Sequence, residues 1–502
     1  MTWPIAGLIE GFYGRPWTWD ERVEVMRWCH ERGMRHYVYA PKDDPKHRQD
    51  WRMPYDAGEI DGFRRLVAEG GLEVGFAISP GLSIDYAAAA DRDALVAKVD
   101  QVLAVGVRLV CLALDDIPNR PGLGAEQAEV AAWLHDRIGE QAGLLLVPTE
   151  YVGVHPSPYL ADLAAGVPAD VAIAWTGVSV VNDAIRAGEA RARADALAGR
   201  PPLLWDNFPV NDGIMGDRLF MGPLWGRDPG LVDECSGYLA NPMVQPRCSK
   251  LPLASVAAWL RGDDPIDAWP READDAGLRV FAEACDGGVP RALVQALADE
   301  EGGMGWAEAA APLARWLSEA AECRAPGLED EAGPWVEQVH AEAEVGLAAL
   351  RLYQATKPVV RVAAAGDGRV VPPEDRRVMA AGFALAARWP AVRRGPVSVM
   401  GARCAFRPSI GQRSDGSPTL LAEGLQEDEN AIDALARLAW QAAAAMEAPA
   451  PAWLGADGEA VDLAEDGSFH VDAAAILLAR SGRAVTRVRV PAEPPLDDRR
   501  VP

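Results

Sequence analysis

Two adjacent carboxylates, Asp115 and Asp116, are the residues of this sequence best suited to transfer protons. They directly follow residues 108–114, an apolar run typical of a buried strand. Two carboxylates in one site raise the pKa of one of them, which would give a proton donor beside a permanent anion. Neighbouring strand residues point to opposite faces, so both can reach one pocket only if the backbone leaves strand geometry there. Alternatively, one of them merely caps the helix that follows.

Polar and aromatic residues also follow the other apolar runs that we interpret as strands. Aromatic rings can stack on the C–H faces of a sugar, and carboxylates and amides can hold its hydroxyls. The pattern therefore predicts a site for an uncharged, polyhydroxylated ligand. Trp175 and Trp205 could instead belong to the core, and Asn207 could cap a loop. The groups concerned occupy residues 10–17, 41–44, 148–151, 175–177, 205–212 and 241–242.

Short apolar runs alternate with helical patterns from the first residues to about residue 260. Eight strands, each followed by a helix, over about 250 residues predict an α/β fold of the (β/α)8 TIM-barrel type. In such a barrel the reactive groups lie where the strands end and the following loops begin. We expect the strands at residues 5–10, 36–40, 73–79, 108–114, 144–148, 171–175, 203–205 and 237–240.

Beyond residue 262 the alternation stops and long Ala-rich helical patterns begin, with apolar residues spaced by three and four. We therefore expect a catalytic barrel at residues 1–262, an α-helical bundle domain at 263–448 and a small C-terminal segment at 449–502. The C-terminal segment is acidic and Pro-rich, which predicts partial disorder. Within the bundle, residues 401–424 are long enough to form a functional or mobile loop.

The composition excludes several classes of partner and cofactor. The 502 residues include 49 Lys and Arg against 74 Asp and Glu, a formal net charge of −25 that disfavours nucleic acid and anionic membranes as partners. The seven Cys and seven His show no metal-ligand spacing, and no nucleotide-binding motif is present, so we expect no metal and no cofactor. The sequence has no signal peptide and no membrane-spanning run, and its cysteines are dispersed, which predicts a cytoplasmic protein.

Seven motifs, in unbroken order over residues 1 to about 260, resemble the catalytic domain of glycoside hydrolase family 84. This family comprises the O-GlcNAcase-type β-N-acetylglucosaminidases, and some of its members are labelled hyaluronidase-like. The richness in Ala, Arg and Gly indicates a bacterial member. The motifs lie at residues 7–17 (GLIEGFYGRPW), 39–48 (YAPKDDPKHR), 114–117 (LDDI), 148–151 (PTEY), 175–177 (WTG), 205–207 (WDN) and 241–242 (NP).

The resemblance implies a TIM barrel and a retaining hydrolysis that the substrate itself assists. In this scheme the 2-acetamido oxygen attacks the anomeric carbon and forms an oxazoline. Asp115 matches the residue that orients and polarises the acetamido N–H. Asp116 matches the general acid that protonates the leaving oxygen and later, as a base, activates water. Only one protein carboxylate then has to carry a proton.

The resemblance also implies substrate-binding roles for eight further residues. Tyr151 matches a tyrosine that supports the acetamido group, and Asn207 matches an amide that holds the paired aspartates. Asp212 matches the carboxylate that binds the outer hydroxyls of the sugar. The other positions line the pocket or bind hydroxyls, namely Tyr13, Trp205, the Gly11 carbonyl, Lys42 and Asn241.

The sequence therefore predicts a retaining β-N-acetylglucosaminidase that removes terminal β-linked N-acetylglucosamine from a glycoprotein, glycopeptide or glycan. The substrate we expect is O-GlcNAc on Ser or Thr of proteins. Two alternatives stay open: a non-catalytic module that binds glycans or glycopeptides, and a glycosidase that degrades hyaluronan or chitin oligosaccharides. The helical region could pack on the barrel, contribute to a groove for the aglycone, or form a homodimer.

Overall fold

The computed structural model describes residues 3–298, 306–364, 376–393, 397–402, 407–412, 418–423, 430–444, 452–454 and 478–480. These residues belong to two compact units, Met1–Asp274 and Asp275–Pro502, and each is described on its own. The sequence placed the end of the first domain at residue 262. In the structure helix α9 (Pro265–Glu272) packs on helix α8 (Pro246–Arg261), and the Trp269 indole donates to the Met221 carbonyl at 2.7 Å, so α9 belongs to the first unit.

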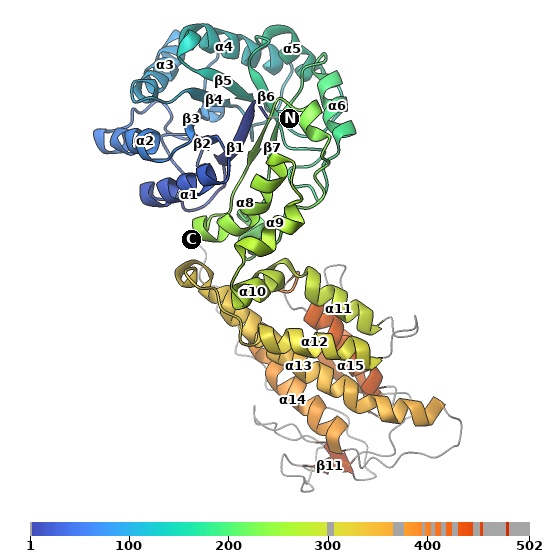
Figure 1. Ribbon diagram of the computed structural model, residues 1–502. Helices are drawn as coiled ribbons and strands as arrows, with labels where there is room; N and C mark the ends of the chain where they lie inside the picture. Colours follow the sequence, from blue (N-terminus) through green and yellow to red (C-terminus); the bar gives the residue numbers. More distant parts are fainter. Residues whose placement is uncertain are drawn as a thin grey trace, which may run out of the picture. The chain divides into compact units, whose positions relative to one another are not determined.

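The first unit is a closed barrel of parallel strands surrounded by helices, which confirms the predicted (β/α)8 fold (Figure 1). Neighbouring strands pair in chain order, and β8 pairs back onto β1. The predicted strand limits differ from the observed ones by at most one residue at either end. The strands are β1 (Ile5–Glu10), β2 (His36–Tyr39), β3 (Glu73–Ile78), β4 (Leu109–Ala113), β5 (Gly143–Val147), β6 (Ala172–Trp175), β7 (Leu203–Asp206) and β8 (Gly237–Ala240).

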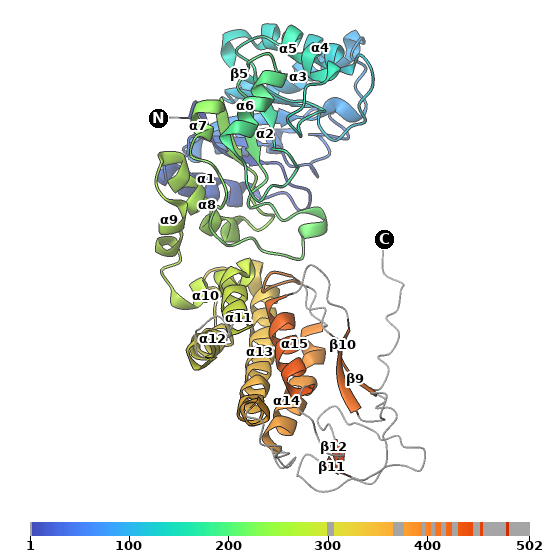
Figure 2. The same ribbon diagram turned by 90° about the vertical axis from the view of Figure 1, so that its right-hand side faces the viewer.

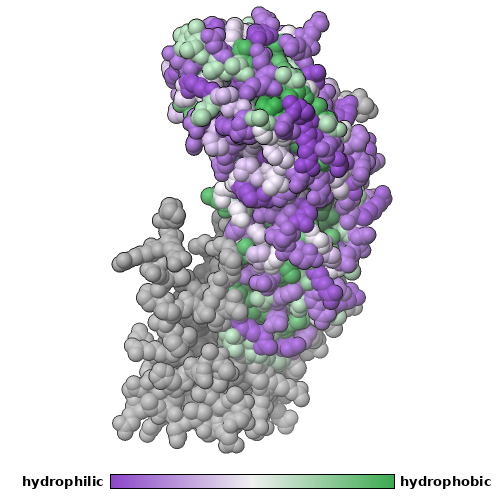
Figure 3. All heavy atoms as spheres, turned by 90° about the vertical axis from the view of Figure 1, so that its left-hand side faces the viewer, coloured by the Kyte–Doolittle hydropathy of each residue, from purple (hydrophilic) through white to green (hydrophobic). Residues whose placement is uncertain are grey.

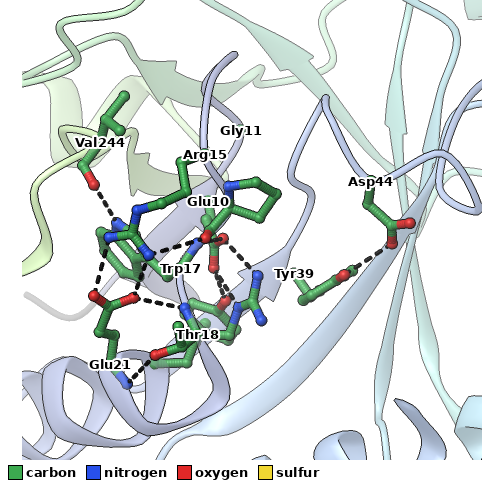
Figure 4. Close-up of polar contacts among 12 residues, drawn as sticks. Glu10, Gly11, Arg15, Trp17, Thr18, Glu21, Tyr39, Asp44 and Val244 are labelled. Carbon is green, nitrogen blue, oxygen red and sulfur yellow. Dashed lines mark hydrogen bonds and ion pairs between the residues drawn. The ribbon is translucent and has the colours of Figure 1, made fainter.

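Helices follow the strands, and local sequence signals fix where several of them begin. At the start of the first helix, Thr18 Oγ1 accepts from the Glu21 N–H at 3.3 Å, while the Glu21 carboxylate accepts from the Thr18 N–H at 2.6 Å (Figure 4). This reciprocal capping satisfies two donors that the helix cannot satisfy itself. The helices are α1 (Trp19–Glu31), α2 (Ala57–Glu69), α3 (Ala89–Leu103), α4 (Leu123–Ile138), α5 (Pro158–Gly166), α6 (Ala187–Ala196), α7 (Leu231–Glu234) and α8.

Alternate strand residues divide into two buried clusters. One cluster contains strand and helix residues, such as Leu8 and Met26, and lies between the sheet and its helices. The other consists mainly of strand residues, among them Ile9, Cys111 and Trp205, and fills the barrel interior. Because the interior is packed with side chains, a ligand can bind only at the end of the barrel.

Glu10 ends β1, yet it points away from the barrel axis and anchors the first helix. Its carboxylate accepts from Arg22 Nε at 2.8 Å and Nη2 at 2.9 Å, and from the Trp17 N–H at 3.1 Å (Figure 4). The Tyr37 hydroxyl donates to it as well. Glu10 is fully buried, so these donors compensate a charge that would otherwise be costly. This polar residue at a strand end is therefore structural.

The second unit consists mainly of helices, as the sequence predicts, with two short antiparallel strand pairs. The long helix α13 packs against both α14 and α15, which Figure 2 shows beside it. The pair β9–β10 lies in the segment expected to be a loop, and most of residues 449–502 lie outside the described residues. The elements are α10 (Ala276–Asp286), α11 (Gly288–Ala298), α12 (Trp306–Ala320), α13 (Glu329–Ala364), α14 (Arg376–Arg393), β9 (Arg407–Gln412), β10 (Pro418–Glu423), α15 (Ala431–Ala444), β11 (Ala452–Leu454) and β12 (Leu478–Arg480).

The surface is polar, in keeping with the high content of charged residues. On the face drawn in Figure 3, hydrophilic residues predominate among the described atoms, and hydrophobic residues occur between them in small groups. No described helix combines the length and the apolar character needed to cross a membrane.

Candidate active site

Asp115 and Asp116 follow β4 at the carboxyl end of the barrel, and the chain leaves strand geometry between them. β4 ends at Ala113, and Asp116 has a positive φ of 55°, a conformation that costs a residue other than glycine about 1–3 kcal/mol. This turn lets both carboxylates face one pocket, as the sequence required. The helix-capping alternative is wrong, because α4 begins at Leu123 after Gly122 and has no side-chain cap.

The Asp115 carboxylate forms a buried ion pair with Lys42, which follows β2. Lys42 Nζ donates to Asp115 Oδ2, and the two side chains are only 3% and 8% exposed. The other oxygen, Oδ1, is buried and has no hydrogen-bond partner among the described residues. A buried acceptor without a donor costs about 1–3 kcal/mol. Because Asp115 lines the pocket, a ligand N–H or O–H can satisfy this oxygen.

The Asp116 carboxylate is held by two phenols and a guanidinium. Tyr13 donates to Oδ2 at 2.7 Å, and Tyr151 donates to Oδ1 at 2.9 Å. Arg48 Nη1 lies 3.7 Å from Oδ2 and also donates to the Tyr13 hydroxyl at 2.5 Å. Arg48 therefore orients Tyr13, and Tyr13 in turn orients Asp116.

The pKa of Asp116 lies below its usual value, which differs from the raised pKa expected for one member of the pair. Burial alone would raise it, but the charge of Lys42 and the hydrogen bonds from Tyr13 and Tyr151 outweigh burial. The expectation considered only the two carboxylates. In the structure the ammonium of Lys42 compensates the charge of Asp115, so repulsion between the carboxylates does not decide the pKa.

One wall of the pocket is an amide network around Trp205. Asn207 Oδ1 accepts from Trp205 Nε1 at 3.0 Å and from Asn241 Nδ2 at 2.9 Å, and Asn207 Nδ2 donates to the Val180 carbonyl at 2.8 Å. Asn241 Oδ1 accepts from the Gly11 N–H at 3.1 Å. Among the described residues the amide of Asn207 has these three partners, and its expected support of the aspartates stays a prediction.

Glycine is required at position 11 because Trp205 lies against the end of β1. A Cβ there would come within 2.2 Å of Trp205 Cζ2. The flat indole face that lines the pocket therefore depends on a backbone without a side chain opposite it. Trp175, in contrast, is fully buried and does not line the pocket, so the core interpretation is correct for that residue.

Asp212 and Tyr13 also meet in the lining of the pocket. Asp212 Oδ2 accepts from the Tyr13 N–H at 2.8 Å. The pKa of Asp212 is raised, first by burial and to a smaller extent by the charge of Asp116, while the Tyr13 N–H acts in the other direction. Such a carboxyl group is a ready partner for hydroxyls.

The pocket collects every residue that the sequence predicted for the site. Gly11, Tyr13, Lys42, Asp115, Asp116, Tyr151, Trp205, Asn207, Asp212 and Asn241 all line it. Sequence reasoning missed Arg48, although it lies in the quoted motif at residues 39–48, and it also missed the remaining lining residues, which are Val147, Thr176, Val180, Val181, Val210 and Met215.

The chemistry available in this pocket is acid–base chemistry and hydrogen bonding to a polar ligand. It offers one carboxylate fixed by an ammonium, a second held by phenols, an indole face and several amides. Among the described residues, no group of three or more His, Cys, Asp or Glu side chains could hold a metal ion. Polar catalytic groups at the end of a (β/α)8 barrel, with an aromatic face for a sugar ring, define a glycoside hydrolase.

Comparison with known proteins identifies the family. The family model described as beta-N-acetylglucosaminidase (NAGidase) matches residues 6–284, more than half of the chain, so the chain belongs to this family, glycoside hydrolase family 84. The protein O-GlcNAcases of Rattus norvegicus and Mus musculus are each 32% identical over 277 residues, which is 52% of this chain. The match covers only 30% of each of these relatives.

Solved structures show the same similarity over most of the chain. A mutant of the Thermobaculum terrenum O-GlcNAc hydrolase superposes with a TM-score of 0.68 at 25% identity, covering 79% of this chain and 91% of that chain. CpGH84B superposes with a TM-score of 0.69 at 23% identity, covering 80% of this chain and 75% of that chain, and this similarity concerns the fold.

Proposed function

We propose that this protein is a retaining β-N-acetylglucosaminidase that removes O-GlcNAc from Ser or Thr of proteins through an oxazoline intermediate. The observation that carries the proposal is the state of Asp115. Its carboxylate is buried and fixed by Lys42, the residue lines the pocket, and one of its oxygens has no donor among the described residues. An acetamido N–H supplies the missing donor, and the fixed negative charge polarises that group for attack through its oxygen.

Asp116 serves as the proton carrier in this proposal. As the acetamido oxygen bonds to the anomeric carbon, the bond to the aglycone oxygen breaks and the proton of Asp116 passes to that oxygen. The carboxylate that remains then takes a proton from water as the water opens the oxazoline. Tyr13 and Tyr151 donate to Asp116 and so stabilise the carboxylate formed after the first step.

The remaining pocket residues bind the sugar ring. Trp205 offers its indole face, and Asp212 accepts from the outer hydroxyls, while the Gly11 carbonyl and the amides of Asn207 and Asn241 complete the wall. Dimerisation through the helical unit and a cytoplasmic location stay predictions from the sequence. The free and buried state of the six cysteines among the described residues is in keeping with that location.

The proposal is tested with two glycosides and one inhibitor. A chromogenic β-N-acetylglucosaminide should be hydrolysed with the β-anomer as first product, the matching β-glucoside should not, and a thiazoline analogue of the oxazoline should inhibit. Initial release of the α-anomer, or equal turnover of the glucoside, would contradict substrate assistance. Absence of any turnover together with glycopeptide binding would support the non-catalytic alternative.

A second set of measurements concerns Asp115 and the aglycone. Alanine at position 115 should slow oxazoline formation even for activated aryl glycosides, because the acetamido group loses its partner. Unchanged turnover would remove Asp115 from the mechanism. Release of N-acetylglucosamine from glycopeptides but not from hyaluronan or chitin oligosaccharides, measured by size analysis of digests, separates the proposed substrate from the polymeric alternatives.

A further inference from the structure

Arg193, in helix α6, is a buried cation without a direct ion pair among the described residues, although the charge of Glu150 favours its protonated form. The residue is 0% exposed, and its guanidinium donates to two backbone carbonyls, those of Glu150 and Gly153. Its Nε has no hydrogen-bond partner among the described residues. Burial lowers the pKa of Arg193 to about 10, a sign of how unfavourable this environment is for the charge. Because burying this charge destabilises the fold, we expect the contacts of Arg193 to serve a purpose other than stability.

The two carbonyls that Arg193 binds enclose Tyr151 and Val152. The same short segment is also joined to β6 and to the residues that follow it. The Tyr151 carbonyl accepts from the Thr176 N–H at 3.0 Å, and the Gly153 carbonyl accepts from Trp175 Nε1 at 2.9 Å. These bonds fix one side of the segment, and Arg193 fixes it from the helix layer.

The side chain of Glu150 connects this segment to the loop that carries the aspartates. Glu150 Oε1 accepts from Asn119 Nδ2 at 2.6 Å, and Oε2 accepts from Ser157, the N-cap of α5. Asn119 follows Asp116 by three residues in the β4–α4 loop. Glu150, the neighbour of Tyr151 in the chain, is thus held at two points. Its carboxylate binds Asn119 and Ser157, and its backbone carbonyl binds Arg193.

We infer that Arg193 is a positioning residue of the reaction: it fixes the peptide on both sides of Tyr151 so that the phenol meets Asp116 Oδ1 at 2.9 Å. Arg193 does not line the pocket and acts only through Tyr151. A guanidinium suits this task because its planar fork presents separate N–H groups to two carbonyls, whereas an ammonium concentrates its donors on one atom. The inference rests on the proposed function, since it requires Asp116 to carry the proton.

Arg200 provides a matched control for this role. Its guanidinium also binds backbone carbonyls, those of Val167, Pro168 and Val171, each at 2.7 Å. These residues precede β6 and lie at the opposite end of the barrel from the pocket. Arg193 and Arg200 therefore share the kind of contact and differ in what the contact holds.

The test is a double-mutant cycle with the pH profile of kcat/KM on a glycopeptide as readout. Arg193→Met and Tyr151→Phe should each lower kcat/KM about tenfold, in line with the loss of one charge-assisted hydrogen bond, and should each move the alkaline limb to higher pH. The combined variant should lose no more than either single variant. Arg200→Met should lower the unfolding temperature and leave the pH profile unchanged.

Several outcomes would overturn the inference. Losses that multiply in the combined variant, or a wild-type pH profile in Arg193→Met, would show that Arg193 does not act through Tyr151. Should Arg193→Met fail to fold, Arg193→Lys takes its place and should give a partial shift in the same direction, whereas an unshifted profile rejects the role. If Asp116→Asn keeps wild-type activity on the glycopeptide, the proposed function fails instead.

Discussion

The barrel and the helical unit each bury carboxyl groups, but they surround them with different partners. In the barrel, the buried Asp115 pairs with Lys42, and the partly exposed Asp116 accepts from two phenols and has a lowered pKa. Glu342 in α13 is fully buried, and its donors among the described residues are two amides, Gln338 Nε2 at 2.8 Å and Asn430 Nδ2 at 3.0 Å.

The different partners shift the pKa values of Asp116 and Glu342 in opposite directions. Burial raises the pKa of Glu342 to about 8, while the amide donors offset this in part and the charge of Asp433 adds to it. Glu342 is therefore largely neutral at pH 7 and joins α13 to Asn430, whose amide also binds the carbonyls of Val399 and Ala402. A nearby cation and phenol hydroxyls thus lower the pKa of a carboxyl group in the barrel, whereas amide donors do not offset the effect of burial on Glu342.

The largest effect is expected when Asp116 is replaced by a residue that cannot donate the proton. Asp116→Asn should lower kcat about 10²- to 10⁴-fold for glycosides with poor leaving groups and much less for activated aryl glycosides, because a good leaving group needs little protonation. The measurement is kcat across a leaving-group series. Asp56→Asn, at the N-cap of α2 and outside the pocket, is the control and should leave the series unchanged. Equal losses along the series would contradict the acid role.

The second-largest effect is expected when the ion pair between Lys42 and Asp115 is broken. Lys42→Met should leave Asp115 as an unpaired buried charge and lower the free energy of unfolding by about 3–5 kcal/mol, measured by denaturant titration. Lys46→Met, which removes a more exposed pair with Glu59, should cost less than about 1 kcal/mol.

Lys42→Arg should keep the charge but crowd the pocket and raise KM. An unchanged KM in Lys42→Arg would mean that the ammonium does not contribute to sugar binding.

A smaller effect is expected from the phenol beside Arg48. Tyr13→Phe removes a donor to the Asp116 carboxylate, so the pKa of Asp116 should rise. The protonated acid then persists to higher pH, and the alkaline limb of kcat/KM for a poor leaving group should move upward. The pH profile of the variant checks this. A limb that stays in place, or moves to lower pH, would show that Tyr13 does not lower the pKa of Asp116.

The smallest effect on activity is expected for Glu342 in the helical unit, where a substitution should change the pH dependence of stability and not kcat. The folded state holds a proton on Glu342 that the unfolded state loses above the ordinary pKa of 4.5, so stability should fall as pH rises from about 4.5 to about 8. Glu342→Gln should remove this slope and leave kcat unchanged. Thermal unfolding over this pH range is the measurement, with the exposed Glu344→Gln as control. A wild-type slope in Glu342→Gln would assign the pH dependence to other groups.

The sequence was sufficient to predict the barrel and ten of the residues that line its pocket. Each strand is a short apolar run that ends in polar residues, and parallel strands bring these ends together, as with Lys42 and Asp115. The sequence also indicated a turn near Asp116, because two neighbours on a regular strand point to opposite faces and cannot both reach one pocket.

Contacts between distant elements were beyond sequence reasoning. Glu10 is an acidic residue at the end of a strand, like Asp115 just after β4. However, its buried partner Arg22 lies in α1 and directs its side chain away from the pocket. The sign of the pKa shift at Asp116 depends on Lys42, whose distance from it no sequence pattern gives. The bonds of Asn207 likewise depend on which loops meet at β7, and Arg193 gives no signal because its partners are backbone carbonyls.

The positive φ of Asp116 has a practical consequence. Asparagine, unlike alanine or glutamine, occupies this region of backbone space readily. The Asp116→Asn variant therefore keeps the turn and the shape of the sugar site while lacking the acid. Under the proposed function we expect this variant to act as a substrate trap that, once immobilised, retains glycoproteins carrying N-acetylglucosamine from a cell extract.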